Sequence, residues 1–232
     1  MSSLTSFFSE IGNILPPEII YARMSHITNM KLEDASHPIG VLTSENRDKW
    51  ATIRNDLEKL GNQEALRLID SAIYCIALDD QSSDDPDKLL TSFLHGDPKN
   101  RWFDKSISLI ITKNGQAAVN FEHSWGDGVA VLRFFTEIFS DTEKHRFITT
   151  NSKLESNANL NEVKQLEFKL DSKLINSINE ANAKYKEAIS RLKIKNFELN
   201  LFGKKFLKKL NVGPDSLMQT AFQVKTFKNF FL

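Results

Sequence analysis

Hydrophobic positions near the start of the chain predict two helices around a short strand. Pro16 and Pro17 stand where a first helical turn tolerates proline, and the pattern continues as a helix through Met30. The apolar stretch 39–42 predicts a short strand. A second helix is expected from Ser44 to Gly61, because serine favours the start of a helix and glycine favours its end.

The next part of the chain predicts a buried strand and a short helix. Residues 72–78 form a short, continuously apolar run, which is typical of a strand buried on both faces. Cys75 lies inside this run, so we expect it to be a small core residue rather than a nucleophile. A polar loop over 79–87 and a short helix ending near His95 and Gly96 are expected next.

Residues 106–122 carry the clearest hairpin pattern of the chain. Two apolar runs, 106–112 and 116–122, flank the sequence Lys-Asn-Gly, and the pair Asn-Gly favours a tight turn. The second run leads directly into His123. Apolar residues then recur at helical spacing over 129–139, which predicts a helix.

The pattern changes after this helix. Residues 140–162 are polar and rich in Ser, Thr and Asn, which predicts a linker or an irregular surface passage. A strand over 164–170, a charged helix over 171–193, a strand over 194–202 and a final helix from Pro214 are expected beyond it. Helices and strands thus alternate on both sides of the linker, so the sequence predicts an α/β fold.

Composition and charge exclude several classes of protein. The 232 residues are 41% hydrophobic and 26% charged, as in ordinary globular domains. The 30 basic and 30 acidic side chains balance, which excludes a strongly basic nucleic-acid binder and an acidic disordered tail. A single cysteine excludes an intramolecular disulfide framework. Neither a membrane-spanning run nor a secretory or mitochondrial targeting signal is recognisable.

Charge is unevenly distributed along the chain. From residue 164 onward there are 14 Lys and Arg against 6 Asp and Glu, whereas the earlier residues hold 16 basic and 24 acidic side chains. An acidic first part joined to a basic last part predicts two units, the second of them suited to an anionic ligand. Solvated lysines on one helix are the simpler explanation of the same bias.

The residues with the clearest chemistry lie at 123–128, His-Ser-Trp-Gly-Asp-Gly. A histidine at the end of a strand, followed by a glycine-flanked aspartate that opens a helix, is placed to reach a cleft. Imidazole is the side chain best matched to general-base work near neutral pH. We expect Asp127 to cap the helix or to anchor a buried cation, and Gly126 and Gly128 to permit a close turn beside the ring.

Simpler interpretations of these residues stay open. A lone histidine is often a satisfied core residue, and Asp127 is open to being an N-cap alone. His123 and Asp127 together are compatible with a metal, although no further ligand cluster accompanies them. Ser124 does not lie in the Gly-x-Ser-x-Gly pattern of a nucleophile elbow. A histidine base that promotes direct transfer therefore explains the site better than a covalent intermediate.

The spacing His-x-x-x-Asp-Gly within 123–128 resembles the signature of CoA-dependent acyltransferases. The wider run 121–135 is similar to the choline/carnitine acyltransferase family. Two flanking runs, 42–51 and 94–106, resemble the same family in the same order. The resemblance covers most of residues 39–223, with a divergent stretch across the linker.

This resemblance implies reversible acyl transfer between CoA and the hydroxyl group of carnitine, with long acyl chains. His123 would deprotonate the carnitine hydroxyl in one direction and the CoA thiol in the other. Asp127 would have a structural and orienting role. CoA or acyl-CoA is then a co-substrate, and no permanently bound cofactor or metal is implied. A short-chain carnitine or choline acetyltransferase is the alternative within the family.

A second, lysine-rich segment resembles the CoA-binding stretch of the family. Lysines suit the phosphates of CoA, and Lys204 and Lys208 would share one face of a helical turn. Gly203 permits a tight entry, and Asp215 after Pro214 suits the start of a helix. A solvated lysine face is the simpler alternative. The resemblance assigns CoA binding to Gly203, Lys204, Lys205, Phe206, Leu207, Lys208, Lys209, Leu210, Asn211, Val212, Gly213, Pro214 and Asp215.

The resemblance further implies a partial form of the two-domain α/β fold of chloramphenicol-acetyltransferase-like enzymes. Residues 1–162 would form part of the first acyltransferase domain, with the catalytic histidine. Residues 163–232 would begin the second, with the CoA-binding segment. The family's Ser-Thr-Ser and Arg-Thr-Glu elements for carnitine are not found in the sequence. We therefore expect an incomplete acyltransferase, and a catalytically inactive, truncated fragment is the alternative.

Partners and location follow from the same resemblance. It implies acyl-CoA and carnitine as substrates, no nucleic acid, and a mitochondrial location on the matrix side of the inner membrane. The full-length enzyme would be a candidate for peripheral membrane association. The apolar C-terminal end of this chain also predicts poor solubility.

Overall fold

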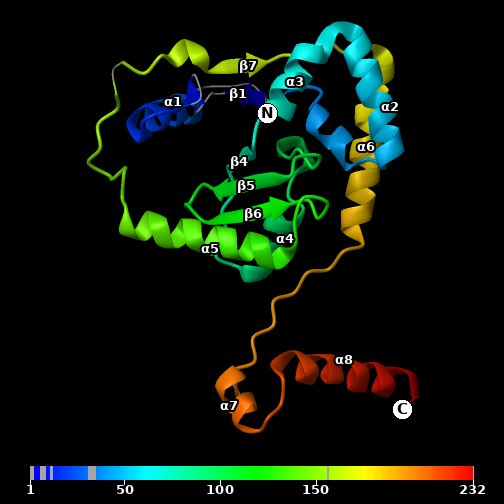
Figure 1. Cartoon of the computed structure of the whole chain (residues 1–232). Helices are drawn as coiled ribbons and strands as arrows, with labels where there is room; N and C mark the ends of the chain where they lie inside the picture. Colours follow the sequence, from blue (N-terminus) through cyan, green and yellow to red (C-terminus); the bar gives the residue numbers. More distant parts are fainter. Residues whose placement is uncertain (1–2, 6–8, 11–12, 31–34, 156, 232) are drawn as a thin grey trace. The chain divides into compact units, whose positions relative to one another are not determined.

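Two helices with apolar residues at helical spacing form the centre of the core. α2 (Arg47–Leu57) and α6 (Ser172–Ser190) lie side by side in the computed structural model, which describes residues 3–5, 9–10, 13–30, 35–155 and 157–231 (Figure 1). The short 3-10 helix η1 (Ile39–Ser44) packs against α6. Each fully buried large apolar side chain contributes about 1.5–3 kcal/mol to folding. The buried cluster consists of Ile39, Val41, Leu42, Trp50, Ile53, Leu57, Leu66, Leu174, Ile178 and Ala181.

The chain divides into two compact units, residues 1–194 and 195–232. The first unit holds the core and the sheet. Besides α2, α6 and η1, its helical segments are α1 (Pro17–Asn29), the π-helical segment η2 (Glu58–Asn62), α3 (Gln63–Ser71), α4 (Pro86–Leu94), η3 (Pro98–Asn100), α5 (Gly128–Lys144) and η4 (Leu160–Glu162). The expected domain boundary after residue 162 stays a prediction.

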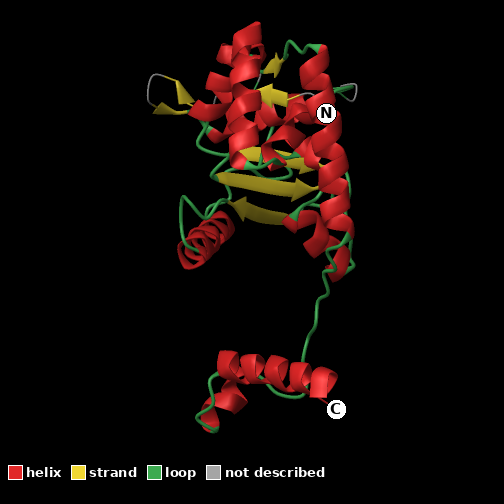
Figure 2. Ribbon diagram, turned by 90° about the vertical axis from the view of Figure 1, so that its right-hand side faces the viewer, coloured by secondary structure: helices red, strands yellow, loops and turns green. Residues whose placement is uncertain are grey.

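A three-stranded sheet lies beside the helical core, in the order β4 (Cys75–Asp79), β5 (Ile107–Thr112), β6 (Ala117–Phe121) (Figure 2). β4 and β5 are parallel, since the chain crosses over through α4 between them. β5 and β6 form the predicted antiparallel hairpin. Gly115 has a φ of 82°, the left-handed conformation that the tight turn needs and that glycine adopts at low cost.

Two short strand pairs complete the first unit. β1 (Ser3–Thr5) pairs antiparallel with β7 (Lys164–Leu166), and β2 (Ser9–Glu10) pairs antiparallel with β3 (Asn13–Ile14). The mixture of helices and strands confirms the α/β class expected from the sequence. None of the helices in the described residues is long and apolar enough to cross a membrane.

Two elements near the start differ from the sequence-based expectation. Residues 39–42 form no strand but part of η1, where Thr43 Oγ1 donates to the carbonyl of Gly40 at 2.6 Å and supports the tight turns. Asn46, not Ser44, caps α2, because its Oδ1 accepts a hydrogen bond from the amide of Asp48 at 2.9 Å.

Gly61 is a turning point rather than the end of the helical region. It has a φ of 90°, and α3 follows directly after it. The side chain of Asn62 then holds this bend to the segment before α6. Its Nδ2 donates to the carbonyl of Lys169 at 2.9 Å, and its Oδ1 accepts from the amide of Lys169 at 2.7 Å. The bend and the start of α6 are thereby fixed to each other.

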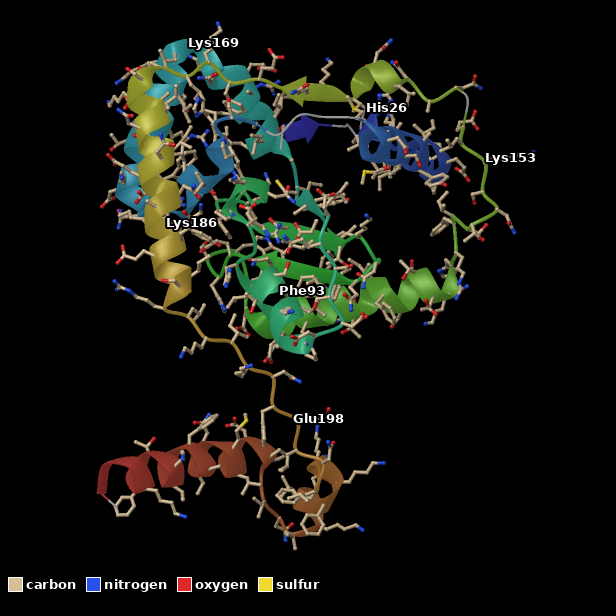
Figure 3. The ribbon with its side chains drawn as sticks, turned by 180° about the vertical axis from the view of Figure 1, so that it is seen from behind. His26, Phe93, Lys153, Lys169, Lys186 and Glu198 are labelled. Atoms are coloured by element: carbon tan, nitrogen blue, oxygen red, sulfur yellow. The ribbon has the colours of Figure 1, made fainter. Side chains whose placement is uncertain are left out.

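The boundaries of the later helices and strands also differ from those that the sequence predicts. α5 continues to Lys144, so the irregular passage begins five residues later than position 140. The strand expected over 164–170 shortens to β7. No regular helix or strand forms over 194–202, a described segment in which Figure 3 labels Glu198. A segment forms a strand only where a neighbouring strand supplies hydrogen bonds, and no strand of the described residues pairs with this one.

The second unit contains two helices. α7 (Lys204–Lys209) is followed by α8 (Pro214–Phe231), the final helix that the sequence predicts. Leu207 is the buried side chain of α7, and its carbonyl accepts a hydrogen bond from the amide of Val212 at 3.0 Å. This contact folds the α7–α8 connection back onto α7.

Candidate active site

His123 lies on a tight turn at the end of β6. The strand is held in register by its antiparallel partner, with Phe121 opposite Ile107 and the amide of Glu122 donating to the carbonyl of Ser106 at 3.0 Å. The chain then turns, since the amide of Trp125 donates to the carbonyl of Glu122 at 3.1 Å. His123 occupies this turn and is exposed, so the alternative of a satisfied core histidine is wrong.

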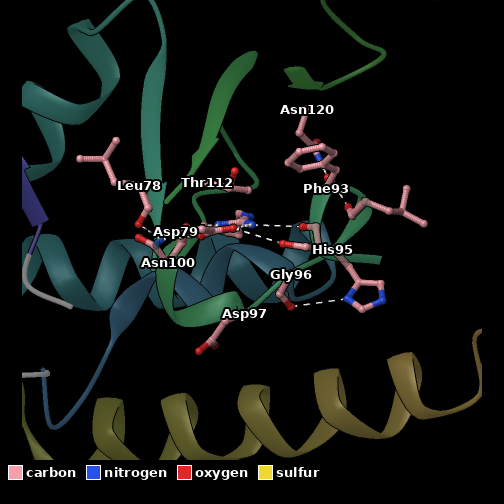
Figure 4. Close-up of polar contacts among 12 residues, drawn as sticks. Leu78, Asp79, Phe93, His95, Gly96, Asp97, Asn100, Thr112 and Asn120 are labelled. Atoms are coloured by element: carbon pink, nitrogen blue, oxygen red, sulfur yellow. Dashed lines mark hydrogen bonds and ion pairs between the residues drawn. The ribbon is translucent and has the colours of Figure 1, made fainter. Parts of the chain in front are cut away.

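The strand that delivers His123 is anchored to α4. Nδ2 of Asn120 donates to the carbonyl of Phe93 at 3.2 Å and to that of Leu94 at 3.0 Å (Figure 4). These are carbonyls of the last turn of α4, which lack partners within the helix. Phe93, labelled in Figure 3, lies on α4 close to the sheet. The end of β6 is therefore fixed three residues before the histidine.

The carboxylate of Glu122 closes the turn. Its Oε2 accepts a hydrogen bond from the amide of Ser124 at 2.9 Å and another from the Ser124 hydroxyl. These two bonds lower the pKa of Glu122, because they favour the ionised carboxylate. The hydroxyl of Ser124 thus helps to close the turn, and the expectation that it is not a nucleophile stays a prediction.

The imidazole of His123 lies against the ring of Phe121. The ring centroids are 5.1 Å apart and the ring planes are inclined by 48°. Phe121 also approaches α5, since a Cβ at Gly128 would lie 4.0 Å from its Cζ. An aromatic side chain thus separates the histidine from the first turn of the helix.

Asp127 occupies the N-cap position of α5. Its backbone is extended, with φ −85° and ψ 152°, and its carbonyl accepts from the amide of Val131 at 3.2 Å. Its side chain makes no capping hydrogen bond and is exposed, so the expected cap through the carboxylate does not form. In the described part of the chain the carboxylate also pairs with no cation, contrary to the expected anchoring of a buried one.

The two glycines of the motif are not required by the backbone. Only Gly61, Gly96 and Gly115 have a positive φ among the described glycines, so Gly126 and Gly128 adopt conformations open to other residues. A Cβ at Gly126 would meet no atom within 4 Å. The turn therefore forms without needing glycine at either position, and the room that the two glycines leave beside the ring stays a prediction.

No metal centre is formed by the described residues. They contain no group of three or more His, Cys, Asp or Glu side chains placed to hold an ion. Cys75 is partly buried in β4, and burial raises the pKa of its thiol, as expected for a core residue.

The lysine-rich segment lies in the second unit. Lys204 and Lys208 both belong to α7 and, four residues apart, share one of its faces. All four lysines of α7 are exposed, and none forms an ion pair with another described residue. Gly203 is extended, with φ −135°, so its backbone does not need glycine. Asp215 lies in the first turn of α8 after Pro214, as expected.

Comparison with known proteins decides the family. A family model described as choline/carnitine O-acyltransferase matches residues 4–230. The chain belongs to this family. The resemblance read from the His-x-x-x-Asp-Gly motif is therefore confirmed.

Individual members of the choline/carnitine O-acyltransferase family are similar over most of the chain. It is 44% identical over 219 residues to mitochondrial carnitine O-palmitoyltransferase 2 of Macaca fascicularis, covering 94% of this chain and 33% of that protein. The human protein of the same name is 42% identical with the same coverage. Carnitine O-acetyltransferase of Mus musculus is 28% identical over 228 residues, covering 94% of this chain and 36% of that protein. The chain thus spans about a third of the length of these relatives.

Two residues at the turn were not predicted. The sequence-based hypothesis named His123 and Asp127 but gave no role to Phe121 and Glu122, which contact the histidine ring and close its turn. A carboxylate two residues before a serine is the signal that points to Glu122, because such a pair closes a short side-chain turn. No short-range pattern points to Phe121, because His123 lies on the turn beyond the end of β6.

Proposed function

We propose that this chain carries the general base of a carnitine O-acyltransferase that acts on long acyl chains. The observation that supports this most is the exposed imidazole of His123 on the turn between β6 and α5, in a member of the choline/carnitine O-acyltransferase family. The choice of long chains rests on relatives named carnitine O-palmitoyltransferase 2 at 42–44% identity.

The proposed reaction is a direct transfer. His123 accepts the proton of the carnitine hydroxyl while the hydroxyl oxygen attacks the thioester carbonyl of acyl-CoA. The carbon–sulfur bond breaks, and the CoA sulfur leaves with the proton that the imidazole had accepted. In the reverse direction the CoA thiol gives its proton to His123. Asp127, at the start of α5, has a structural and orienting role in this proposal.

CoA binding is proposed for residues 203–215. The exposed lysines of α7 carry positive charge without a described anionic partner, which suits the phosphates of CoA. Acyl-CoA and carnitine are the substrates, and no permanently bound cofactor is part of the proposal.

Architecture and location are proposed from the family. The chain would form part of the two-domain chloramphenicol-acetyltransferase-like fold, with a first domain over 1–162 and a second beginning at 163. The named relatives are mitochondrial proteins, which supports a mitochondrial location. The matrix side of the inner membrane, with peripheral membrane association of the full-length enzyme, is the finer proposal.

The decisive experiment measures thiol release from palmitoyl-CoA with and without carnitine, using the purified chain. Carnitine-dependent release that His123→Ala abolishes would support the proposal. His145→Ala is the matched control, because His145 is also exposed but lies on the far end of α5. Release that persists in His123→Ala would overturn the assignment of the base.

The alternative is that the chain alone transfers no acyl groups. It is favoured by the fact that the chain spans only about a third of its relatives and that the carnitine elements of the family are not found in it. No release in the assay above would establish this alternative. If transfer does occur, a series from acetyl-CoA to palmitoyl-CoA separates the long-chain proposal from a short-chain acetyltransferase.

Binding of CoA can be tested without catalysis. Calorimetric titration with CoA should show a weaker complex for the double variant Lys204→Glu, Lys208→Glu than for the wild type. Lys153→Glu is the control, since this lysine lies in the irregular passage of the first unit (Figure 3). Equal affinities in all three proteins would remove residues 203–215 from the proposal.

A further inference from the structure

The turn that presents His123 is closed almost entirely by one residue. Ser124 donates two hydrogen bonds to the carboxylate of Glu122, and Trp125 donates one to its carbonyl. These three bonds bracket His123 in the sequence. Residues 122–127 belong to neither β6 nor α5. The amide of Glu122 still bonds to Ser106 of the hairpin and the carbonyl of Asp127 to Val131 of α5, but no strand ladder or helical repeat holds residues 123–126.

The ring of Phe121 gives the imidazole a surface to lie on. The observed centroid distance of 5.1 Å places the imidazole of His123 in contact with the ring of Phe121, the last residue of β6. Phe121 is itself confined, because its residue pairs with Ile107 of β5 and its ring lies close to Gly128. The imidazole therefore has a rigid neighbour on one side and solvent on the other.

We propose that Glu122 is a positioning residue for His123, acting through Ser124 to hold the imidazole against the ring of Phe121. The histidine is exposed and makes no hydrogen bond with another described residue, so its position depends on the turn. Opening the turn would let the ring leave Phe121 and sample solvent. A general base works only when it is held within hydrogen-bond reach of the proton it removes.

The carboxylate form of Glu122 is the one that accepts both bonds from Ser124. Those bonds hold the pKa of Glu122 below its ordinary value, so the carboxylate is ionised and accepts both bonds at neutral pH. Arg47, at the start of α2, also attracts this carboxylate and forms its own ion pair with Asp104, Nη2 to Oδ1 at 2.5 Å. Both hydrogen bonds join residues of this chain. The proposal rests on the proposed function only for the role of His123 as a general base.

The first experiment reads the position of the ring and not the reaction. In the chain labelled with carbon-13 histidine, the His123 ring signal should be displaced by the ring current of Phe121, and Phe121→Leu should abolish this displacement. Glu122→Ala and Ser124→Ala should each remove at least about half of the displacement. Ser124→Thr retains a hydroxyl and should therefore retain the displacement. The His145 signal is the internal reference. Glu137→Ala, which removes an exposed carboxylate paired with Arg133, is the matched control.

Each outcome of the ring-signal experiment either supports the positioning role of Glu122 or overturns it. If the full displacement survives in Glu122→Ala and Ser124→Ala, or if Phe121→Leu shows that no displacement exists, the proposal is overturned. Should Glu122→Ala fail to unfold cooperatively, Ser124→Ala and Ser124→Thr decide alone. Where the wild type transfers acyl groups, the two alanine variants should lose on the order of tenfold to a hundredfold in kcat with KM little changed. Absence of transfer in all proteins defeats the proposed function, and the ring signal still tests the positioning.

Discussion

The guanidinium of Arg101 makes a two-point contact with the carboxylate of Asp79, Nη1 to Oδ1 at 2.8 Å and Nη2 to Oδ2 at 2.7 Å. Nη2 also donates to the carbonyl of Ser92 at 3.1 Å, and Asn100 donates to Asp79 Oδ1 at 2.9 Å (Figure 4). The pair joins the end of β4 to α4 and to the loop that enters β5. Burial of Asp79 opposes its ionisation, but Arg101, Asn100 and Ser92 together outweigh this and lower its pKa.

Removing the charge of Asp79 should strongly destabilise the first unit. Asp79→Asn leaves the Arg101 guanidinium buried without its counter-ion, and breaking a buried pair in this way costs about 3–5 kcal/mol. Urea unfolding measures the loss. Glu64→Gln removes a carboxylate from an exposed pair with Arg67 and should cost little stability, because solvent screens such pairs. Equal losses in the two variants would contradict the assigned role of the buried pair.

Stability should fall in acid because of Glu45. Its buried carboxylate accepts from Lys49 Nζ at 2.9 Å and from Lys184 Nζ at 2.8 Å. Burial opposes ionisation, yet the two lysines outweigh it and lower the pKa of Glu45 below the ordinary 4.5. The unfolded chain then binds the proton more readily, so the contribution is complete above the ordinary pKa and is lost as pH falls through the lower folded-state value.

The measurement is the free energy of unfolding from about pH 7 down to about pH 3. Glu45→Gln should be less stable than the wild type at neutral pH and should show a flatter decline in acid. Asp79 contributes a decline of the same sign, so some slope remains in the variant. An unchanged slope would show that Glu45 titrates alike in the folded and unfolded chain.

Gly40 should not tolerate a methyl group. A Cβ at this position would lie 2.3 Å from the carbonyl oxygen of Arg101 and 3.4 Å from that of Pro98, and both atoms are backbone. Gly40→Ala should therefore cost about 1–3 kcal/mol or more. Gly126→Ala meets nothing within 4 Å and should change stability by less than about 1 kcal/mol. Thermal unfolding of both variants checks the contrast, which fails if Gly40→Ala unfolds at the wild-type temperature.

The outer face of α5 should drive self-association. Val129, Leu132 and Phe139 are 75%, 67% and 64% exposed and recur at helical spacing. Sedimentation of the wild type should reveal aggregates that the double variant Leu132→Glu, Phe139→Glu reduces. Arg133→Glu, on the same helix and paired with Glu137, should not reduce them. A monodisperse wild-type monomer would contradict this prediction and the poor solubility expected from the sequence.

Local sequence patterns were sufficient for the part of the fold that carries the histidine. The hairpin of β5 and β6 follows from two alternating runs around Asn114 and Gly115, and both strand pairing and turn depend on neighbours a few residues apart. α5 follows from apolar residues at helical spacing. The His-x-x-x-Asp-Gly spacing and three longer runs in the same order, 42–51, 94–106 and 121–135, pointed to the family, since the chemistry of a motif is carried by residue types at fixed intervals.

Tertiary structure determined the conformation of segments whose local sequence does not specify a helix or a strand. Residues 39–42 have the composition of a strand, yet they form η1 because they are buried against α6, some 130 residues away, and no strand lies beside them in the described part of the chain. The segment 194–202 alternates apolar and polar residues over 197–201, another strand-like pattern, and forms no regular element. Strand formation needs hydrogen-bond partners from elsewhere, which a single segment of sequence does not specify.

In the candidate site, too, some features follow from the sequence and others only from the tertiary structure. Sequence alone placed His123 after a strand and Asp127 at the start of a helix, because both positions follow from short-range periodicity. Only the folded turn determined that the ring lies on Phe121 and that Glu122 bonds to Ser124, leaving Asp127 unbonded. Which of several nearby polar groups meet depends on backbone direction, and the pairing of β6 with β5 and the packing of α4 against β6 set that direction.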